Sequence, residues 1–184
     1  DYLDLGRDYS VIKKQIVKDE IMEEAVKFGY GIRILKQDLF ENLISFIISA
    51  NNRIPMIMKV VASIAQSLGR EIEYNGEKFY AFPGPEQLAN YPVEKLWECK
   101  GGFRCKYISA ASKAVASGAI DLGDLKKMDA DSGRKLLMKF NGVGRKVADC
   151  VLLYSGTRYD VFPTDVWVKR VMEELYLGEK SSFD

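Results

Sequence analysis

Two side chains, Lys146 and Asp165, stand where an amine and a carboxylate could act together. Gly142-Val143-Gly144 is predicted to open a helix, with Lys146 in its first turn, and Asp165 stands at the start of the next predicted helix. The helix N-terminus and the apolar residues that follow Lys146 should lower the pKa of its amine. An unprotonated amine can attack a sugar carbon and form a Schiff base.

Each of these residues also has a purely structural interpretation. Lys146 could be an ordinary solvated lysine, because lysine is rarely buried. Asp165 before an apolar helix is a common N-cap, a role that Thr164 could share, and capping is compatible with catalysis. Cys150 lies four residues beyond Lys146 and should share its helix face. A small buried core residue is the alternative for Cys150.

The segment Gly142-Val143-Gly144 is suited to binding a phosphate group. Glycine permits positive φ and close backbone approach, and the amides that open a helix attract an anion. Gly-x-Gly alone is a weak pattern, and a plain packing joint between two helices is its alternative. A dinucleotide-binding fold is disfavoured, because the third glycine and the preceding strand are missing.

The elements that must position these residues are predicted to be helices, which makes the fold class all-α. Strand-like alternation is sparse, and apolar residues recur at helical spacing. The stretch 75–85 is expected to be a loop. The helix over 37–49 should be buried, and the helix that begins near Pro55 should end at Gly69. The remaining helices are expected over 10–28, 85–90, 92–98, 104–117, 131–139, 145–155 and 165–177.

Composition narrows the classes of protein. The 184 residues are 47% hydrophobic with a net charge of +1, which indicates one folded domain or two small lobes. No apolar run reaches ~18 residues, so no membrane span is expected. The basic residues between positions 100 and 117 could form a solvated face. The three scattered cysteines fit a reducing cytoplasm, and the chain has no histidine for acid–base work or for zinc.

The segment 142–150, followed by Pro163-Thr164-Asp165-Val166, resembles the helix-hairpin-helix DNA glycosylases. Within that superfamily it is similar to the 8-oxoguanine DNA glycosylase/AP lyases. The similarity extends from about Leu35 to Tyr176 and includes the segments 45–52 and 102–107. The resemblance implies a helix-hairpin-helix glycosylase fold, with two helical lobes flanking a cleft.

The resemblance also implies a chemical role for the residues around the hairpin. Lys146 would attack C1′ of the damaged nucleotide, displace the base and form a Schiff base that permits β-elimination. Asp165 would be the helper carboxylate, and Cys150 would line the base pocket. DNA phosphate would be held by the backbone amides of the hairpin residues Gly142, Val143, Gly144 and Arg145. No cofactor is required, but a structural cation could sit on the backbone carbonyls of Met138, Phe140 and Val143.

On the opposite side of the cleft, the resemblance implies residues that replace the extruded nucleotide. Phe103 would wedge into the base stack, and Asn51 and Arg104 would face the opposite cytosine. Asn52 would also bind DNA. Extruding a base costs a few kcal/mol, which an aromatic wedge and polar fillers offset. The glycines before Phe103 and Arg104 predict an exposed tip. A core aromatic and a surface charge are the structural alternatives for this pair.

The chain departs from the family pattern at several positions. Asn141 replaces a proline before the hairpin, and Met56 replaces an arginine that reads the opposite cytosine, so we expect weaker discrimination among opposite bases. Trp167 replaces a histidine, which changes one expected DNA contact. We find no N-terminal sheet domain with a base-recognising glycine and no pocket-closing C-terminal aromatic, and both ends look cut. The expected units are 1–34, the end of a preceding module; 35–130, a lobe with wedge loops; and 131–184, the catalytic lobe.

The leading hypothesis is therefore a bifunctional glycosylase/AP lyase for oxidised guanine. Its partner would be double-stranded DNA containing an oxidised base. We expect a monomer, in the cytoplasm and nucleoid of a prokaryote or in the nucleus of a eukaryote. One alternative is an endonuclease III-type enzyme, although the iron–sulfur cysteines of that group are not found here. Adenine glycosylases generally lack the lysine. A non-catalytic helix-hairpin-helix DNA-binding module is the alternative from another class, and a structural helical adaptor is the remaining one.

Overall fold

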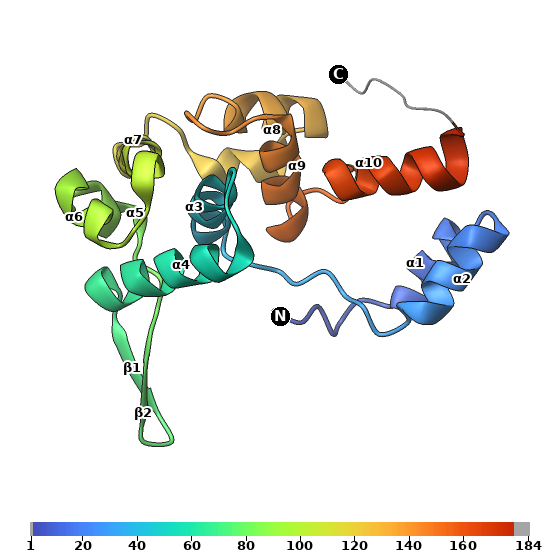
Figure 1. The fold of residues 1–184 in the computed structure, drawn as a ribbon, viewed down its shortest axis with the longest axis horizontal. Coiled ribbons are helices and arrows are strands. Elements are labelled where there is room, and N and C mark those ends of the chain that lie inside the picture. Colours follow the sequence, from blue (N-terminus) through green and yellow to red (C-terminus); the bar gives the residue numbers. More distant parts are fainter. Residues whose placement is uncertain (1, 179–184) are drawn as a thin grey trace.

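The computed structural model describes residues 2–178, and helices dominate this part of the chain, which confirms the predicted fold class (Figure 1). No helix in the described residues is long and apolar enough to cross a bilayer. The N-terminal half contains α1 (Tyr9–Ile16), α2 (Glu20–Phe28), α3 (Leu39–Ser49), α4 (Ile54–Leu68), β1 (Glu71–Tyr74), β2 (Glu77–Tyr80), α5 (Pro85–Ala89) and α6 (Val93–Glu98). The C-terminal half contains the 3-10 helix η1 (Gly102–Arg104), α7 (Cys105–Ala116), the 3-10 helix η2 (Leu122–Lys127), α8 (Ala130–Leu137), α9 (Arg145–Tyr154), α10 (Val166–Met172) and the π-helix η3 (Glu173–Leu177).

Helix α3 forms the centre of the core, as its apolar sequence predicts. It contacts α4, α7 and α9, and Figure 1 shows it between the two sides of the molecule. Asp38 begins the helix by accepting from the backbone N–H groups of Phe40 and Glu41, the usual N-cap arrangement. Its fully buried apolar side chains are Leu43, Ile44, Ile47 and Ile48.

Helix α4 begins and ends where its sequence predicts. Pro55 lies in the first turn, where its missing N–H removes no helical hydrogen bond. Gly69 follows the last residue of the helix, and a Cβ there would lie 1.8 Å from the carbonyl oxygen of Ala81. Only glycine therefore lets the chain after β2 pass this close to the end of α4.

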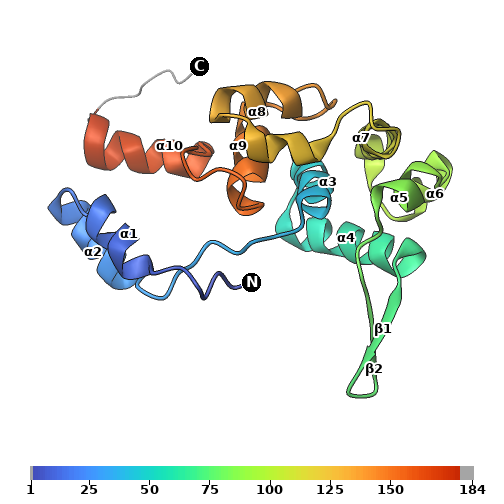
Figure 2. The ribbon, with the colours of Figure 1, turned by 180° about the vertical axis from the view of Figure 1, so that it is seen from behind.

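The prediction of one helix over 10–28 is wrong, because the chain forms two helices there. Val17 leaves the helical conformation with ψ of 99°, and Asp19 then accepts from the N–H of Met22 as the N-cap of α2. Neither helix has a buried residue. Both views show the pair beside α10 and η3, where the Tyr176 hydroxyl contacts the Asp19 carboxylate at 3.3 Å (Figures 1 and 2).

The prediction of a loop over 75–85 is also wrong in its first part. Strands β1 and β2 form an antiparallel hairpin in which Tyr74 is opposite Glu77. Asn75 and Gly76 make the two-residue turn with φ of 52° and 78°, as expected for an Asn-Gly hairpin turn. The hairpin projects from the end of α4 away from the rest of the molecule (Figure 1).

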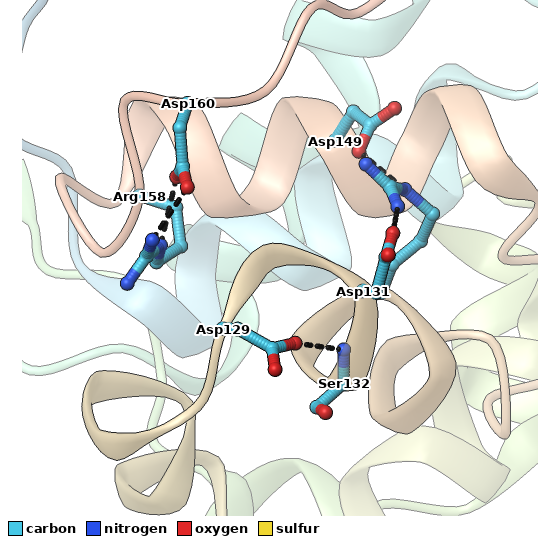
Figure 3. Close-up of polar contacts among 7 residues, drawn as sticks. Asp129, Asp131, Ser132, Asp149, Arg158 and Asp160 are labelled. Atoms are coloured by element: carbon cyan, nitrogen blue, oxygen red, sulfur yellow. Dashed lines mark hydrogen bonds and ion pairs between the residues drawn. The ribbon is translucent and has the colours of Figure 1, made fainter.

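Helices α8 and α9 are joined by the glycine hairpin and packed by a close contact and an ion pair. A Cβ on Gly133 of α8 would lie 3.2 Å from Leu152 of α9, so a glycine allows the helices to approach. Arg134 of α8 donates to the buried carboxylate of Asp149 at 2.8 Å and to Asp131 (Figure 3). Asp129 caps α8 by accepting from the N–H of Ser132. These contacts fix the helix that carries Lys146.

After α9 the chain turns into the segment that carries Asp165. Arg158 donates to Asp160 in this connection (Figure 3), and α10 begins after Asp165. Residues 179–184, the end of the predicted catalytic lobe, lie outside the described residues.

Candidate active site

The glycine hairpin is shaped by one residue with positive φ. Gly142 has φ of +85°, and a Cβ on it would lie 2.7 Å from Cδ2 of Tyr107. Val143 is buried and donates its N–H to the Phe140 carbonyl at 3.1 Å. Gly144 has an extended backbone with φ of −93°, so the expectation of two glycines with special conformations applies to Gly142 only.

The first turn of α9 presents backbone donors. Gly144 is the N-cap residue, and no side chain caps the helix. Arg145 is exposed beside these amides. Uncapped N–H groups at a helix start, with a cation next to them, can hold a phosphate.

Lys146 lies in the first turn of α9, as predicted, and its side chain is half-buried. Its Nζ is 5.5 Å from the centroid of the Phe46 ring. Phe46 in turn stacks on Tyr154, with ring centroids 5.8 Å apart and an angle of 18° between the planes. The amine therefore points over an aromatic surface built from α3 and α9, and not along the outer face of α9.

A cavity of about 470 Å³ opens between α3, the start of α4, α9 and the start of α10. Helix α3 supplies Asn42, Ser45, Phe46 and Ser49, which share one face, and α9 supplies Lys146, Cys150 and Tyr154 from its own facing side. The volume is within the usual range for sites that enclose small molecules. Its lining consists of Gln37, Asn42, Ser45, Phe46, Ser49, Ile54, Ile57, Met58, Lys146, Cys150, Tyr154, Pro163, Asp165 and Val168.

Asp165 lines the same cavity as Lys146 and also caps α10, as predicted. One carboxylate oxygen accepts from the N–H groups of Trp167 and Val168, each at 2.9 Å. A second cavity, of about 720 Å³, also has Lys146 and Asp165 in its lining, together with Arg145. The amine and the carboxylate thus stand where the two cavities meet, fixed from two different helices.

Cys150 is buried, 4% exposed, and lies in the wall of the 470 Å³ cavity. Burial raises the pKa of its thiol, while the nearby Lys146 amine opposes that shift. Burial likewise raises the pKa of the Tyr154 phenol. The cavity wall next to Lys146 therefore favours uncharged groups at neutral pH.

The loop before α7 carries an exposed aromatic tip. Phe103 is 51% exposed and packs edge-on against Tyr107, with ring centroids 6.1 Å apart. Tyr107 is the residue that touches Gly142. The predicted wedge and the hairpin are thus connected through one tyrosine.

Arg104 differs from the exposed tip that its sequence context predicts. The residue is 8% exposed, and its guanidinium donates to the carbonyl oxygens of Ala50 and Asn51. Asn51 itself is exposed with φ of 48°. The amide of Asn52 is engaged within the protein, because its Nδ2 donates to the Ile48 carbonyl and its Oδ1 accepts from Arg53.

Of the remaining predicted site residues, Trp167 and Met138 lie on the surface and Phe140 is buried. Trp167 is 67% exposed, with the Arg170 guanidinium 5.0 Å from its ring centroid. Met138 is 48% exposed, whereas Phe140 is buried and its carbonyl already accepts from Val143. The cation on these backbone carbonyls stays a prediction.

Sequence reasoning did not identify the aromatic platform of Phe46 and Tyr154 or the polar residues beside it. Asn42, Ser45, Phe46 and Ser49 follow the i, i+3, i+4, i+7 spacing of one helix face. Polar residues at that spacing within so apolar a helix were the available indication that this face lines a cavity.

Comparisons with known proteins extend the similarity to the whole chain. The structure of MBOgg1 in complex with a low-affinity DNA ligand superposes with a TM-score of 0.95 at 54% identity, over 99% of this chain and 63% of that one. The Clostridium acetobutylicum 8-oxoguanine glycosylase/lyase, bound to double-stranded DNA with cytosine opposite 8-oxoguanine, has a TM-score of 0.93 at 44% identity, over 98% and 62%.

A curated relative, a probable N-glycosylase/DNA lyase of Methanothermobacter thermautotrophicus, is 31% identical over 182 residues, which is 88% of this chain and 58% of that protein. The chain thus spans 58% to 63% of the length of these three proteins. Residues 1–43 match the model of the 8-oxoguanine DNA glycosylase N-terminal domain. Residues 44–182, which include the hairpin, Lys146 and Asp165, match the model of the HhH-GPD superfamily base excision DNA repair proteins, and the chain belongs to that superfamily.

Proposed function

We propose that this protein is a bifunctional DNA glycosylase/AP lyase that removes oxidised guanine from duplex DNA. The observation that carries the proposal is the position of Lys146, whose amine faces an aromatic-walled cavity that Asp165 also lines. The activities for which the similar C. acetobutylicum and M. thermautotrophicus proteins are named support the same reaction. Double-stranded DNA with an oxidised base is the proposed partner of a monomer that works in the nucleoid or nucleus.

The proposed reaction begins with attack of the Lys146 nitrogen on C1′ of the damaged nucleotide. The bond from C1′ to the base breaks, and the base leaves with the bonding electron pair and takes up a proton. The Lys146 nitrogen then loses one proton, and its lone pair expels the ring oxygen O4′, which takes up a proton as the ring opens. The product is a protonated Schiff base between the amine and C1′. Removal of a proton from C2′ expels the 3′ phosphate and nicks the strand.

Asp165 is suited to stabilise positive charge during these steps. Its carboxylate is fixed by the two amides at the start of α10, so it needs little reorganisation as charge develops at C1′. The same two hydrogen bonds explain why the residue is both a cap and the helper carboxylate. Charge stabilisation by a fixed group is usually worth more than stabilisation by a mobile one.

The proposed pocket for the extruded base is the cavity between α3 and α9. Phe46, Tyr154 and Cys150 give it an apolar wall, and Asn42 and Ser45 give it polar groups. C1′ cannot be reached while the base is stacked, so the nucleotide must leave the duplex. Phe103 is the exposed aromatic that would fill the stack, and Asn51 lies on the neighbouring loop to face the opposite base.

The proposed DNA grip is the start of α9 and the surface around it. The amides after Gly142 and the exposed Arg145 would hold phosphate, and a cation on the carbonyls of residues 138, 140 and 143 would strengthen that grip. Trp167, exposed beside Asp165, would add a further contact with the strand. Contacts of this kind position the enzyme without reading sequence.

Borohydride trapping tests the proposal directly. Reduction during turnover should join the protein to DNA containing 8-oxoguanine through Lys146, and Lys146→Gln should abolish the crosslink. Lys135→Gln is the matched control, because Lys135 is exposed on α8, outside both cavities, and its variant should be trapped like the parent. Trapping that survives in Lys146→Gln would remove the amine from the mechanism.

A panel of duplexes with one lesion each separates the remaining alternatives. Base release and nicking at 8-oxoguanine support the proposal, whereas release of another damaged base alone would favour a different substrate within the superfamily. Binding that is salt-dependent, indifferent to lesions and followed by no base release would indicate a non-catalytic module.

A further inference from the structure

The Arg104 side chain joins two loops that are far apart in the sequence. Its Nε donates to the Ala50 carbonyl at 2.7 Å, and its Nη2 donates to the carbonyls of Ala50 and Asn51 at 2.5 and 2.7 Å. The residue is 8% exposed. Every N–H bond of Nε and Nη2 therefore ends on backbone of the loop after α3.

That loop has a backbone conformation that needs support. Asn51 has φ of 48°, in the left-handed region, and its side chain is exposed. Asparagine adopts this region more often than most residues other than glycine, but still at a cost in free energy. Such conformations persist when the surroundings hold them. The Arg104 guanidinium restrains the loop by donating to two adjacent carbonyls. Hydrogen bonds from a charged donor are stronger than those between neutral groups.

The same guanidinium also holds the aromatic tip. Its carbon lies 4.4 Å from the centroid of the Phe103 ring. Phe103 is further restrained by its edge-on contact with Tyr107. One buried cation thus forms hydrogen bonds with the Asn51 loop and lies over the Phe103 ring.

We propose that Arg104 is a positioning residue that holds Asn51 and Phe103 as one preformed unit for entry into the duplex. The proposal rests on the proposed function and adds to it, because the expectation from resemblance was a direct contact between Arg104 and the opposite cytosine. Arg104 acts through Asn51 and Phe103. The unit presents one aromatic and one amide side chain to the gap left by the extruded nucleotide. The Asn51 loop is already ordered before DNA binds.

Hydrogen exchange of the DNA-free protein tests the restraint itself. In Arg104→Met, the amides of residues 50–52 should exchange at least about tenfold faster than in the parent, because the loop loses three charge-assisted hydrogen bonds. Lys106→Met is the matched control: it removes an exposed charge two residues away and should leave exchange at 50–52 unchanged. Unchanged exchange in Arg104→Met would overturn the proposal.

A double-mutant cycle tests whether the residue acts through Asn51. Single-turnover base release from a duplex with 8-oxoguanine opposite cytosine should fall roughly tenfold to a hundredfold in Arg104→Met and in Asn51→Ala. In the Asn51→Ala background, Arg104→Met should cost less than in the parent, because only the placement of Phe103 then remains for Arg104 to support. Effects that multiply would show two independent contacts with DNA and would overturn the proposal.

Arg104→Lys distinguishes geometry from charge. A single ammonium cannot bridge both carbonyls as the planar guanidinium does, so this variant should keep most of the defect in exchange and in base release. Full rescue by lysine would show that only the positive charge matters and would contradict the positioning role. Thermal unfolding of each variant checks that the fold is retained.

The proposed function and the positioning role of Arg104 can fail separately. A parent protein that releases no base from any duplex would overturn the proposed function, while the exchange experiment would still decide whether Arg104 holds the loop. If the parent releases the base normally and the effects of Arg104→Met and Asn51→Ala on the rate multiply, the proposed function stands and the positioning role is rejected.

Discussion

The ring of Tyr107 occupies the place that a side chain on Gly142 would take. A Cβ on Gly142 would lie 2.7 Å from Cδ2 of Tyr107, closer than such atoms approach in proteins. Tyr107 packs edge-on against Phe103, and Phe103 lies against Arg104. The hairpin that would hold phosphate and the tip that would enter the duplex therefore belong to one packed unit.

This relationship predicts that Gly142→Ala destabilises the protein. The substitution combines φ of +85°, which disfavours a Cβ, with a clash against Tyr107. We expect the free energy of unfolding to fall by about 1–3 kcal/mol. Denaturant unfolding measures this loss of stability. The Kd for an abasic duplex should rise in the same variant.

Gly144→Ala is the control for that prediction. Gly144 has negative φ, and no atom lies within 4 Å of the place that its Cβ would take, so the free energy of unfolding should fall by less than about 1 kcal/mol, the usual loss when alanine replaces a better N-cap residue. Equal losses in the two variants would show that glycine flexibility in general, and not the Tyr107 contact, sets the stability of the hairpin.

The sequence was sufficient to predict the local structure that places Lys146 and Asp165. The Gly-Val-Gly segment, the apolar residues after Lys146 and the cap at Asp165 act within a few residues of one another. Pro55 and Gly69 mark the two ends of α4 for the same reason. Local rules of this kind do not depend on the rest of the fold.

Features that depend on distant contacts could not be predicted in that way. The burial of Arg104 requires the carbonyls of Ala50 and Asn51, more than fifty residues earlier in the chain. Phe46 forms the floor under Lys146 because α3 and α9 pack together. The β1–β2 hairpin was predictable, since Asn75-Gly76 joins two short segments that contain isoleucine, phenylalanine and tyrosine, and the loop interpretation gave too much weight to glycine and proline.

The double role of Asp165 predicts different results for two substitutions. Asparagine caps a helix about as well as aspartate, so Asp165→Asn should keep the free energy of unfolding within about 0.5 kcal/mol while losing the carboxylate charge. Asp165→Ala should lose about 1 kcal/mol because two amides lose their acceptor. Both variants should slow base release, measured in single turnover. Full activity of Asp165→Asn would assign the residue to capping alone.

The ion pair between Arg134 and Asp149 predicts a large effect on stability. Asp149 is buried, and Arg134 reaches it from α8 at 2.8 Å. Removing the carboxylate in Asp149→Ala leaves a mostly buried guanidinium without its inner partner, which should cost about 3 kcal/mol. Asp131→Ala is the matched control, because that carboxylate is exposed and its loss should cost less than about 1 kcal/mol. Thermal or denaturant unfolding compares the two.

Met56 predicts weak discrimination among the bases opposite the lesion. It lies in the first turn of α4, 40% exposed, and has no charged group to read a base. Excision rates opposite C, A, G and T should therefore differ little in the parent. Met56→Arg should raise the preference for cytosine about tenfold, the value of one specific side-chain contact with a base, whereas Met56→Leu should not. A strong cytosine preference in the parent would contradict the prediction.

Cys150 predicts a pH-dependent chemical reactivity. Burial raises the pKa of its thiol above the ordinary value of 9.0, and Lys146 only partly opposes that shift. The folded protein therefore holds the thiol proton more tightly than the unfolded chain, and the associated stability is lost as pH rises above 9.0. Alkylation by iodoacetamide, followed by peptide mass spectrometry, should be slow at pH 8 and should accelerate only above the ordinary thiol range. Denatured protein is the control, in which the three cysteines should react alike. Rapid labelling of Cys150 in the native protein at pH 7 would contradict the prediction, because it would show an activated thiol beside Lys146.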